Sequence, residues 1–435
     1  MNESKKERIV VIGGGFAGLN FVKTIDKKRY DVILIDRNNY HSFPPLFYQL
    51  ASSGLDPASI CFPFRREMQR PKAKGTEFHM GEVRSIDADR RVVTTGSEQI
   101  PYDRLVIAAG TTNNFFGDNG LRNRVFTLKS TSEALRIRNE MLDRLEFASL
   151  CSDSQQRRKL LSFVVIGGGP TGVEMAGAIG EMKRYVIKRE YPTIDPDEIS
   201  IVLLEGSDRL LRAMSQEAST EALNSLRNLM VDVRLNTLMK SYDGRILTLA
   251  SGETIASETV IWTAGITAEN FLFTGTSVPQ HGPGGRFMTD DRCRVLGVDD
   301  VYAIGDVGYF ESPEWPHGLP QLAQVAIQEA VYLARNMKHD DFSAPFSYVD
   351  KGSMATIGRG RAVADIKKFR LSGYPAWLIW MFIHLISILG MRNKITVLIN
   401  WIWSYFTYNT SLRLIIRTSK FPLRRFNDGD ENAQS

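Results

Sequence analysis

The sequence predicts an α/β fold in which a strand, a glycine-rich turn and a helix recur in two separate parts of the chain. The pattern of Arg8–Asn20 is repeated in Ser162–Gly177. Each copy is followed by an apolar strand that ends in an acid, Asp31–Asp36 after the first and Ile199–Glu205 after the second. A β-branched run before a glycine turn is typical of a buried parallel strand. We therefore predict two βαβ units and two Rossmann-like dinucleotide-binding domains.

The first glycine-rich loop predicts a nucleotide site. Gly13, Gly15 and Gly18 form the pattern G-x-G-x-x-G, in which a missing Cβ permits a tight turn, the approach of a pyrophosphate and close packing of the helix on the strand. The helix N-terminus offers N–H donors to phosphate. Asp36 ends the next strand, where its carboxylate can accept bonds from ribose hydroxyls. A turn that serves only packing is the alternative, but strand, glycines, helix and acid in this order favour nucleotide binding.

The second loop, with Gly167, Gly169 and Gly172, supports the same prediction. Its acid is Glu205, which lies further along than usual because residues 181–198 are intercalated. A carboxylate at this position would repel the additional phosphate of NADPH, so NADH is favoured. The nearby Arg209 keeps NADPH open as an alternative.

The strands that follow the loops indicate how the domains are threaded. Pro101–Thr112 and Glu258–Thr267 both end in small residues, and Val301–Gly308 adds a further apolar strand with an acid. The simplest threading inserts the second nucleotide domain into the first. We predict the first domain at residues 1–120 and 266–345, the second at 121–265, and a separate C-terminal unit at 346–435.

Two nucleotide domains in one chain suggest that a flavin and a nicotinamide meet face to face. Hydride transfer between them needs positioning more than an acid or a base. Asp306, at the end of its strand, could bond the ribityl chain or the pyrophosphate of the flavin, and a helix cap is the alternative role.

The charge distribution and the cysteine content indicate which binding partners and which cellular compartment the protein has. The net charge of the 435 residues is +5, yet residues 366–427 hold ten Lys/Arg and no Asp or Glu. Such a tail suggests an anionic surface, either lipid or nucleic acid. Cys61, Cys151 and Cys293 are isolated, which fits a reducing compartment and predicts neither a disulfide scaffold nor a metal site. The N-terminus has no apolar segment with a cleavage site, so we expect no secretory signal.

The C-terminal region predicts two helices that lie on a membrane surface. Ala376–Leu389 is apolar except for His384 and Ser387, and at about 1.5 Å per residue it covers roughly 21 Å, short of a bilayer core of ~30 Å. We expect the basic segment Met391–Lys394 to interrupt it and a second helix to follow. The polar residues of this helix form one stripe: Thr396, Asn400, Ser404, Thr407 and Ser411. An amphipathic membrane anchor is therefore the prediction.

Other readings of these helices remain open. They could close a dimer or cover the core, and lipid binding does not exclude either role. The aromatic residues stand in long apolar runs and are not interleaved with charge, which argues against nucleic acid and suits the headgroup boundary: Trp377, Trp380, Trp401, Trp403, Tyr405 and Tyr408. For His384, a satisfied polar group on its helix is favoured over a role toward quinone.

Several longer motifs resemble known proteins. Thr263–Ile266 and Ala303–Asp306 resemble the two-dinucleotide flavoprotein reductases in general. Closer motifs resemble the type II NADH:quinone oxidoreductases, namely Tyr40–Ser52, Gly167–Glu181, Ala323–Gln328, Met354–Val363 and Gly373–Tyr408. The resemblance covers almost the whole chain, and its last motif is the most specific.

The resemblance implies non-covalent FAD in the first domain and NADH in the second, with hydride transfer to the flavin and then two-electron reduction of a membrane quinone without proton pumping. The implied FAD site comprises Gly13, Gly14, Gly15, Phe16, Ala17, Gly18, Asp36, Arg37, Val83, Ala109, Gly110, Asp306, Ala323 and Gln324. The implied NADH site comprises Gly167, Gly169, Pro170, Thr171, Gly172, Glu174, Glu205, Ala264 and Gly265.

Three residues receive chemical roles from the resemblance. Glu174 is expected near the nicotinamide and the flavin as the catalytic residue, although a first-turn acid favoured by the helix dipole is the alternative. Gln324 and Gln328 are expected to bind the quinone, although they could be polar positions on one helix face.

The family implies a respiratory electron-transport protein. We expect a homodimer, peripheral on the cytoplasmic face of the cell membrane, with quinone and anionic lipid as partners and no nucleic acid. Sibling enzymes that use paired redox cysteines are disfavoured by the three isolated cysteines. The remaining alternatives are a soluble NAD(P)H-dependent reductase of a carrier protein, which the tail disfavours, and a flavin-binding interaction protein that responds to redox state.

Overall fold

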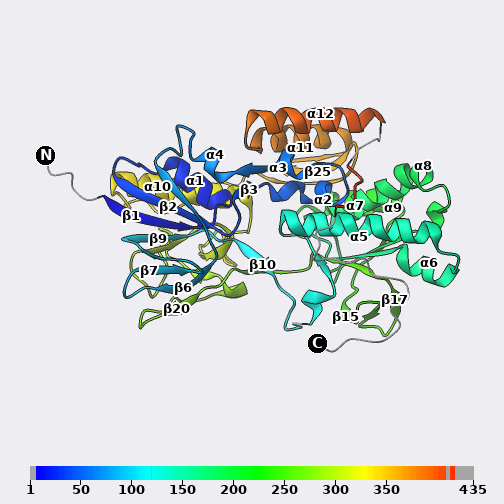
Figure 1. Ribbon diagram of the computed structural model, residues 1–435, viewed down its shortest axis with the longest axis horizontal. Helices are drawn as coiled ribbons and strands as arrows, with labels where there is room; N and C mark the ends of the chain where they lie inside the picture. Colours follow the sequence, from blue (N-terminus) through cyan, green and yellow to red (C-terminus); the bar gives the residue numbers. More distant parts are fainter. Residues whose placement is uncertain (1–5, 119, 408–411, 417–435) are drawn as a thin grey trace.

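Two parallel five-stranded sheets form the centres of two lobes in the computed structural model (Figure 1), which describes residues 6–118, 120–407 and 412–416. The first sheet has the order β22 (Val301–Ala303), β9 (Arg104–Ile107), β1 (Glu7–Ile12), β2 (Tyr30–Asp36) and β5 (Thr76–Met80). The second has the order β11 (Phe126–Thr127), β18 (Thr259–Trp262), β12 (Ser162–Ile166), β13 (Ser200–Leu204) and β14 (Asp232–Arg234). The predicted α/β fold with two βαβ units is confirmed.

Glycine permits each helix to begin directly at the end of its strand. A Cβ on Gly18 would lie 1.9 Å from the carbonyl oxygen of Gly13, and a Cβ on Gly172 would lie 1.8 Å from that of Gly167. Gly13 and Gly167 also have positive φ angles, of 95° and 110°. Helices α1 (Phe16–Thr24) and α7 (Pro170–Met182) can therefore pack against the sheets that precede them.

The lobes are connected by two adjacent strands. β10 (Thr111–Asn113) and β19 (Ile266–Ala268) pair antiparallel between the lobes (Figure 1). All strands of the second sheet lie between them in the chain, so the chain enters and leaves this lobe through one pair of strands. The domain boundaries drawn from the sequence stay a proposal.

Smaller sheets complete both lobes. They are β20 (Leu272–Thr274), β6 (Val83–Asp87), β7 (Val92–Thr95) and β8 (Gln99–Pro101); β15 (Met239–Tyr242), β16 (Ile246–Leu249) and β17 (Thr254–Ala256); β3 (Tyr40–Ser42) and β4 (Cys61–Pro63); and β21 (Phe287–Met288) and β23 (Gly308–Tyr309). The other helices of the lobes are α2 (Phe47–Ala51), α3 (Pro57–Ile60), α4 (Phe64–Glu67), α5 (Thr131–Leu150), α6 (Ser154–Leu160), α8 (Lys188–Glu190), α9 (Gln216–Asn228) and α10 (Ala323–His339). Between α7 and α8 the helix has a π-helical turn, Lys183–Ile187.

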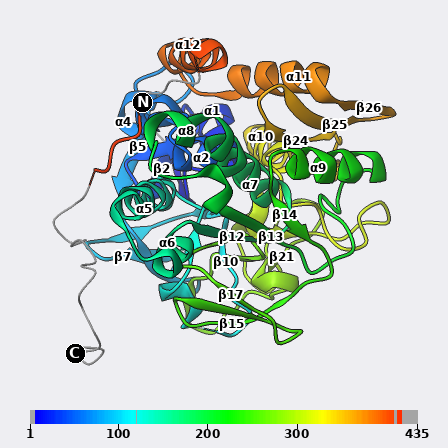
Figure 2. The same cartoon turned by 90° about the vertical axis from the view of Figure 1, so that its right-hand side faces the viewer.

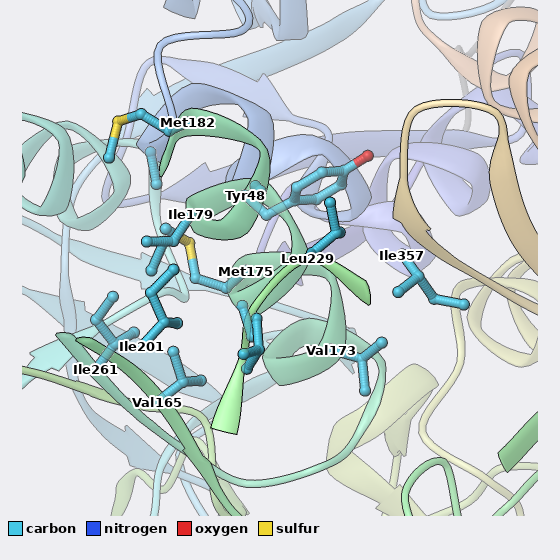
Figure 3. Close-up of a cluster of buried hydrophobic side chains, with 14 of the residues drawn as sticks. Tyr48, Val165, Val173, Met175, Ile179, Met182, Ile201, Leu229, Ile261 and Ile357 are labelled. Carbon is cyan, nitrogen blue, oxygen red and sulfur yellow. The ribbon is translucent and has the colours of Figure 1, made fainter. Parts of the chain in front are cut away.

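The C-terminal elements share their core with the second lobe. They comprise the sheet β24 (Ser353–Gly358), β25 (Arg361–Ile366) and β26 (Phe369–Ser372), and the helices α11 (Gly373–Ser387) and α12 (Met391–Thr407). β24 packs against α7 at Gly177, where a Cβ would lie 2.4 Å from the carbonyl oxygen of Ile357. Figure 3 shows Ile357 and Tyr48 beside the α7 residues Val173 and Met175. Buried residues of β24, β25, α11 and α12 belong to this same hydrophobic cluster, so the expected separate unit has no core of its own.

The break between α11 and α12 lies earlier than expected. Ile388 is extended, and Gly390 takes a positive φ angle of 82°, which reverses the chain. The expectation that Met391–Lys394 separates the two helices is wrong, because these residues form the first turn of α12. The segment contains no glycine or proline after Gly390 that would prevent helix formation.

α12 turns its apolar face outward and buries Asn393, Val397 and Trp401 against the protein, while the described residues of the expected polar stripe, Thr396, Asn400, Ser404 and Thr407, are half-buried. Asn393 donates to the carbonyl oxygen of Cys61 at 3.1 Å, and the indole N–H of Trp401 donates to Gln49 Oε1 at 2.8 Å. The exposed apolar residues of the two helices form what we call the outer apolar face: Tyr374, Leu378, Phe382, Ile383, Ile386, Met391, Ile395, Leu398, Ile399, Ile402, Trp403 and Phe406. Both helices run along one edge of the molecule in both views (Figures 1 and 2). Ser411 and Tyr408 lie outside the described residues.

In the part of the chain that the structure describes, no helix combines the length and the apolar character that crossing a membrane requires.

Candidate functional site

The first glycine loop and its acid form one hydrogen-bonded unit. Gly13 N–H donates to Ile35 O at 2.8 Å, which fixes the loop to the end of β2. Gly14 N–H donates to Asp36 Oδ2 and Asn38 N–H to Asp36 Oδ1, each at 2.7 Å. Burial raises the pKa of the Asp36 carboxyl, and these two N–H groups oppose the shift. The carboxylate is thus held beside the loop at the edge of the sheet.

The loop leaves open space where a pyrophosphate would approach. A Cβ on Gly15 would meet no atom within 4 Å, whereas a Cβ on Gly14 would lie 2.1 Å from the ring of Phe64. Gly110, after β9, also faces open space and has a positive φ angle of 71°. A loop without side chains at a helix N-terminus is a cradle for phosphate. The residues present therefore fit FAD.

The remaining residues of the FAD prediction lie at the same edge of the first sheet or at the start of α10. Phe16, Ala17 and Gly18 begin α1, Arg37 follows β2, Val83 follows β5, Ala109 follows β9, Asp306 follows β22, and Ala323 and Gln324 begin α10. The carboxyl ends of parallel strands are where ligands of such sheets bind. Arg37 lies 3.8 Å from Glu269 in an ion pair.

Asp306 is surrounded by cations that sequence reasoning missed. Burial raises the pKa of its carboxyl, and the positive charges of Lys129 and Arg286 oppose the shift. Lys129 Nζ donates to Thr111 Oγ1 at 2.7 Å, at the junction of the two lobes. No side chain caps the turn that contains Asp306, which disfavours the helix-cap alternative. These cations come from distant segments, and no local pattern marks them.

The second loop repeats the first. Gly168 N–H donates to Glu205 Oε2, while Ser207 donates its N–H and its hydroxyl to Glu205 Oε1, each at 2.7 Å. A Cβ on Gly169 would meet no atom within 4 Å. Pro170 and Thr171 begin α7, and Ala264 and Gly265 follow β18, so the residues of the NADH prediction also converge at one sheet edge.

Arg209 is held by its own segment. Its Nη1 donates to Met214 O at 3.1 Å and its Nη2 donates to Arg212 O at 2.7 Å. A guanidinium bound to backbone carbonyls is less available to an additional phosphate. The geometry thus favours NADH over the NADPH alternative.

Glu174 turns away from the helix N-terminus and toward the C-terminal sheet. Its Oε1 accepts a hydrogen bond from Thr356 N–H at 3.5 Å. Burial raises the pKa of this carboxyl to about 8, and the Thr356 N–H opposes the shift. A carboxyl with such a pKa can hold or release a proton near neutrality. The alternative role of a first-turn acid is therefore disfavoured.

Gln324 and Gln328 bind the segment that leads into β24. Gln328 Nε2 donates to Val349 O at 2.9 Å and its Oε1 accepts from Val349 N–H at 3.0 Å. Gln324 donates to Gly352 O at 3.1 Å and accepts from Lys351 N–H at 3.0 Å. Their amides thus hold residues 349–352 against α10. Their role toward quinone stays a prediction.

A cavity of about 150 Å³ lies between α2, α7, the β24–β25 hairpin, α11 and α12. Its carboxylates are Glu174 and Glu181, and its aromatic wall contains Trp377, Trp380 and Trp401. Except for Glu174, sequence reasoning did not place these residues in a common site, although the other four also stand in the motifs that carry the resemblance. The only available signal was the spacing of Glu174 and Glu181, seven residues apart on one helix.

His384 is a satisfied polar group beside this cavity. Its Nδ1 bonds to Trp380 O at 2.7 Å, and its ring stacks on the Trp380 indole with centroids 4.1 Å apart. Burial lowers the pKa of this imidazole to about 4, although the bond to the carbonyl opposes the shift. The preferred sequence interpretation fits this environment.

Comparison with known proteins agrees with the sequence resemblance. Residues 7–330 match the family model of the pyridine nucleotide-disulphide oxidoreductases, and residues 351–408 match the NDH2 C-terminal domain. The chain is 33% identical over 413 residues to the type II NADH:quinone oxidoreductase Ndh of Mycobacterium tuberculosis, covering 91% of this chain and 88% of the relative. It is 30% identical to the mitochondrial internal alternative NAD(P)H-ubiquinone oxidoreductase A1 of Arabidopsis thaliana, covering 93% and 85%.

Solved structures share the fold. NDH2 of Plasmodium falciparum in complex with NADH superposes with a TM-score of 0.85 at 24% identity, covering 95% of this chain and all of that one. The sulfide:quinone oxidoreductase of Aquifex aeolicus superposes with a TM-score of 0.69 at 18% identity, covering 93% and 96%. At these identities the likeness concerns the fold alone.

The open space at the two central glycines yields a paired prediction. Gly15→Val should fold, because its side chain meets no protein atom, but should purify without FAD and without flavin absorbance. Gly169→Val should retain FAD and bind NADH weakly. Flavin spectra and NADH titrations of both variants measure this. A fully flavinated Gly15→Val protein would show that FAD binds elsewhere.

The geometry of Glu205 predicts the nucleotide preference. NADH should exceed NADPH in kcat/KM by about tenfold or more, which corresponds to about 1.4 kcal/mol. Glu205→Gln removes the repulsive charge but can still accept the Gly168 N–H bond, so it should narrow this ratio. Steady-state kinetics with both nucleotides, at constant quinone, measure the ratio. Equal values in the unmodified protein would contradict the assignment.

Proposed function

The chain belongs to the type II NADH:quinone oxidoreductase family, and from this premise we propose where in the structure quinone reduction takes place. The protein is an FAD-dependent NADH:quinone oxidoreductase. Bound FAD supplies the two-electron chemistry that links NADH oxidation to quinone reduction. The proposal is that quinone binds in the cavity between α7 and the helices α11 and α12.

The observation that carries this proposal is that the cavity lies between helix α7 on one side and helices α11 and α12 on the other. Helix α7 begins at the second glycine loop, which is the NADH site, and Glu174 in its second turn lines the cavity. The opposite wall belongs to α11 and α12, whose other sides form the outer apolar face. A quinone that arrives from lipid would therefore reach the nucleotide sites without crossing water.

The size and the lining of the cavity suit a quinone ring. A space of about 150 Å³ can hold one six-membered carbon ring. Trp380, Trp401 and Met381 supply apolar contacts, while Tyr48 and Glu174 supply polar ones, as is usual for small-molecule sites. Trp401 also donates to Gln49 Oε1, and Gln49 Nε2 donates to the Tyr48 hydroxyl at 2.7 Å. These bonds fix the polar group of the site relative to α12.

We propose that Glu174 serves as the proton donor and acceptor of this site. It is the buried carboxyl nearest to the second loop in sequence, and its pKa of about 8 permits both states near neutrality. Gln324 and Gln328 remain proposed contributors from α10. Through their bonds to residues 349–352 they would also position the strand β24 that carries Thr356.

We further propose that the outer apolar face lies in the membrane interface. Exposed apolar patches of this kind mark interaction surfaces. Basic side chains border the face: Arg392 and Lys394 at the start of α12, and Arg65 and Arg66 on α4. The two segments are neighbours, because a Cβ on Gly390 would lie 2.8 Å from the ring of Phe62. Such a border would attract anionic headgroups.

The two alternative functions explain fewer features of the structure than quinone reduction does. A soluble reductase of a carrier protein needs no outer apolar face, and a flavin-binding interaction protein needs no cavity beside the nicotinamide site. The homodimer and the cytoplasmic face of the membrane stay predictions. Sedimentation of the detergent-purified protein and protease accessibility in oriented vesicles would test them.

Filling the cavity tests the quinone assignment. Ala178→Leu adds a branched side chain to the cavity wall. Because the smaller cavity excludes the quinone ring, the KM for quinone should rise about fivefold or more. The rate of flavin reduction by NADH should stay unchanged. In the matched control, Ala250→Leu, the substituted residue is exposed on the second lobe. This variant should change neither the quinone KM nor the rate of flavin reduction. Stopped-flow and steady-state kinetics measure the two effects. An unchanged quinone KM in Ala178→Leu would reject the cavity.

Charging the outer apolar face tests the membrane assignment. Ile402→Glu with Phe406→Glu should reduce binding to phosphatidylcholine–phosphatidylglycerol vesicles about a hundredfold, since each buried side chain contributes about 1.5–3 kcal/mol. Leu272→Glu with Val278→Glu, at exposed apolar sites of the first lobe, is the matched control. Vesicle flotation measures binding. These variants are preferable to truncation, which would uncover the buried Trp380 and Trp401.

A further inference from the structure

Helix α7 carries a second carboxylate toward the cavity. Glu181 follows Glu174 by seven residues, which is about two turns and roughly 10 Å along the axis. Both accept hydrogen bonds from the β24–β25 hairpin, Glu174 from Thr356 N–H and Glu181 from Arg359 N–H. Both also line the same cavity. The helix thus presents a carboxylate at two levels of one space.

Tyr48 lines the same cavity as both carboxylates. Burial, and then the negative charges of Glu174 and Glu181, raise the pKa of this hydroxyl well above its ordinary value, and the bond from Gln49 opposes the shift. The oxygen accepts a hydrogen bond from Gln49 Nε2 at 2.7 Å. Its own proton can therefore be donated to a carboxylate. Tyr48 comes from α2, which packs against α7, and Figure 3 shows its side chain in the hydrophobic cluster with the α7 residues Met175 and Ile179.

The reaction requires a route for protons. The net conversion NADH + H⁺ + quinone → NAD⁺ + quinol takes up one proton from water in each turnover. The part of the cavity formed by Trp380, Met381 and Trp401 offers no carrier. The polar lining residues besides Glu174 and Tyr48 include Glu181, Arg359, Ser404 and Tyr405, and Arg359 of the hairpin donates its backbone N–H to Glu181 Oε1.

We propose that Glu181 carries protons from solvent into the quinone cavity and passes them through Tyr48 to Glu174. This rests on the assignment of the cavity to quinone. In the step, the Glu181 carboxyl gives its proton to Tyr48 Oη while the Tyr48 hydroxyl gives its own proton to the Glu174 carboxylate. Glu174 then protonates one quinone oxygen as the ring receives two electrons, and the second proton of the quinol is the one that left NADH within its hydride. Glu181 regains a proton from water.

The surroundings of Glu181 allow both of its protonation states. Burial raises the pKa of this carboxyl, and the Arg359 N–H followed by the charges of Arg359 and Arg361 oppose the shift. The other titratable and charged groups that face the cavity are Tyr48 of α2, Tyr185 of the π-helical turn, Tyr405 of α12 and Arg413. Opposing influences of this kind suit a group that must bind and release protons in turn.

A purely structural role for Glu181 would consist of holding Arg359 N–H. Glu181→Gln keeps an oxygen acceptor for that bond but cannot carry a proton. Anaerobic stopped-flow of the FAD-loaded protein separates flavin reduction by NADH from flavin reoxidation by a short-chain quinone. In Glu181→Gln, reduction should stay unchanged, whereas reoxidation should slow about tenfold or more. The solvent deuterium isotope effect on reoxidation should increase, and added formate should restore the rate.

The controls separate this proposal from the cavity assignment. Glu217→Gln, at an exposed acid of α9, should change nothing, and Glu181→Asp should recover part of the rate. Tyr48→Phe should show the same slow reoxidation and keeps the test valid if Glu181→Gln does not fold. Unchanged reoxidation in both Glu181→Gln and Tyr48→Phe, or equal slowing of both half-reactions without rescue by formate, would overturn the relay. If Ala178→Leu still raises the quinone KM, the relay alone has failed; if it does not, the cavity assignment has failed as well.

Discussion

The close approach of backbone to backbone along α7 is the constraint on which the rest of the site depends. At its start, Gly172 permits contact with the carbonyl of Gly167, and five residues later Gly177 permits contact with the carbonyl of Ile357. A single methyl group at Gly177 would lie 2.4 Å from that oxygen and would separate β24 from the helix. One helix can therefore present its N-terminus to a nucleotide and its side to the C-terminal sheet. Glu174 lies between these two contacts, which explains how a carboxyl close in sequence to the second glycine loop also lines a cavity beside the C-terminal elements.

The amphipathic helix α12 exposes its apolar side and buries polar groups against the protein. Its buried side includes Asn393 and Trp401, which donate hydrogen bonds to Cys61 and Gln49, and many of its large apolar residues are exposed on the opposite side. In water such an arrangement would be costly, because apolar surface stays exposed while polar groups are buried. The buried polar groups are satisfied by specific partners, so the cost is confined to the outer apolar face. The chain Trp401–Gln49–Tyr48 also means that a shift of α12 would move a polar group of the cavity.

Buried ionisable groups lie at two places: Glu174 of α7 against the C-terminal sheet, and Glu329 of α10, which accepts from Gly305 N–H, with Asp306 after β22. Glu174 and Glu329 both have pKa values raised by burial to about 8, and Asp306 is buried beside Lys129 and Arg286. Burying a charge is unfavourable unless partners compensate for it. Such groups are retained where chemistry requires them more often than where stability does.

The sequence by itself determined the fold class and both nucleotide loops. These depend on local sterics: glycines that must lack a Cβ, β-branched strands and acids at strand ends, all of which stand within short windows around Gly13–Asp36 and Gly167–Glu205. Only the tertiary structure decided which face of α12 points outward, that Gln324 and Gln328 bind residues 349–352, and that Lys129 and Arg286 face Asp306. The cavity was equally invisible, since Tyr48, Glu181, Arg359 and Trp401 come from four distant segments. Periodicity reports that a helix has two faces, but only packing against the other elements determines which of them is buried.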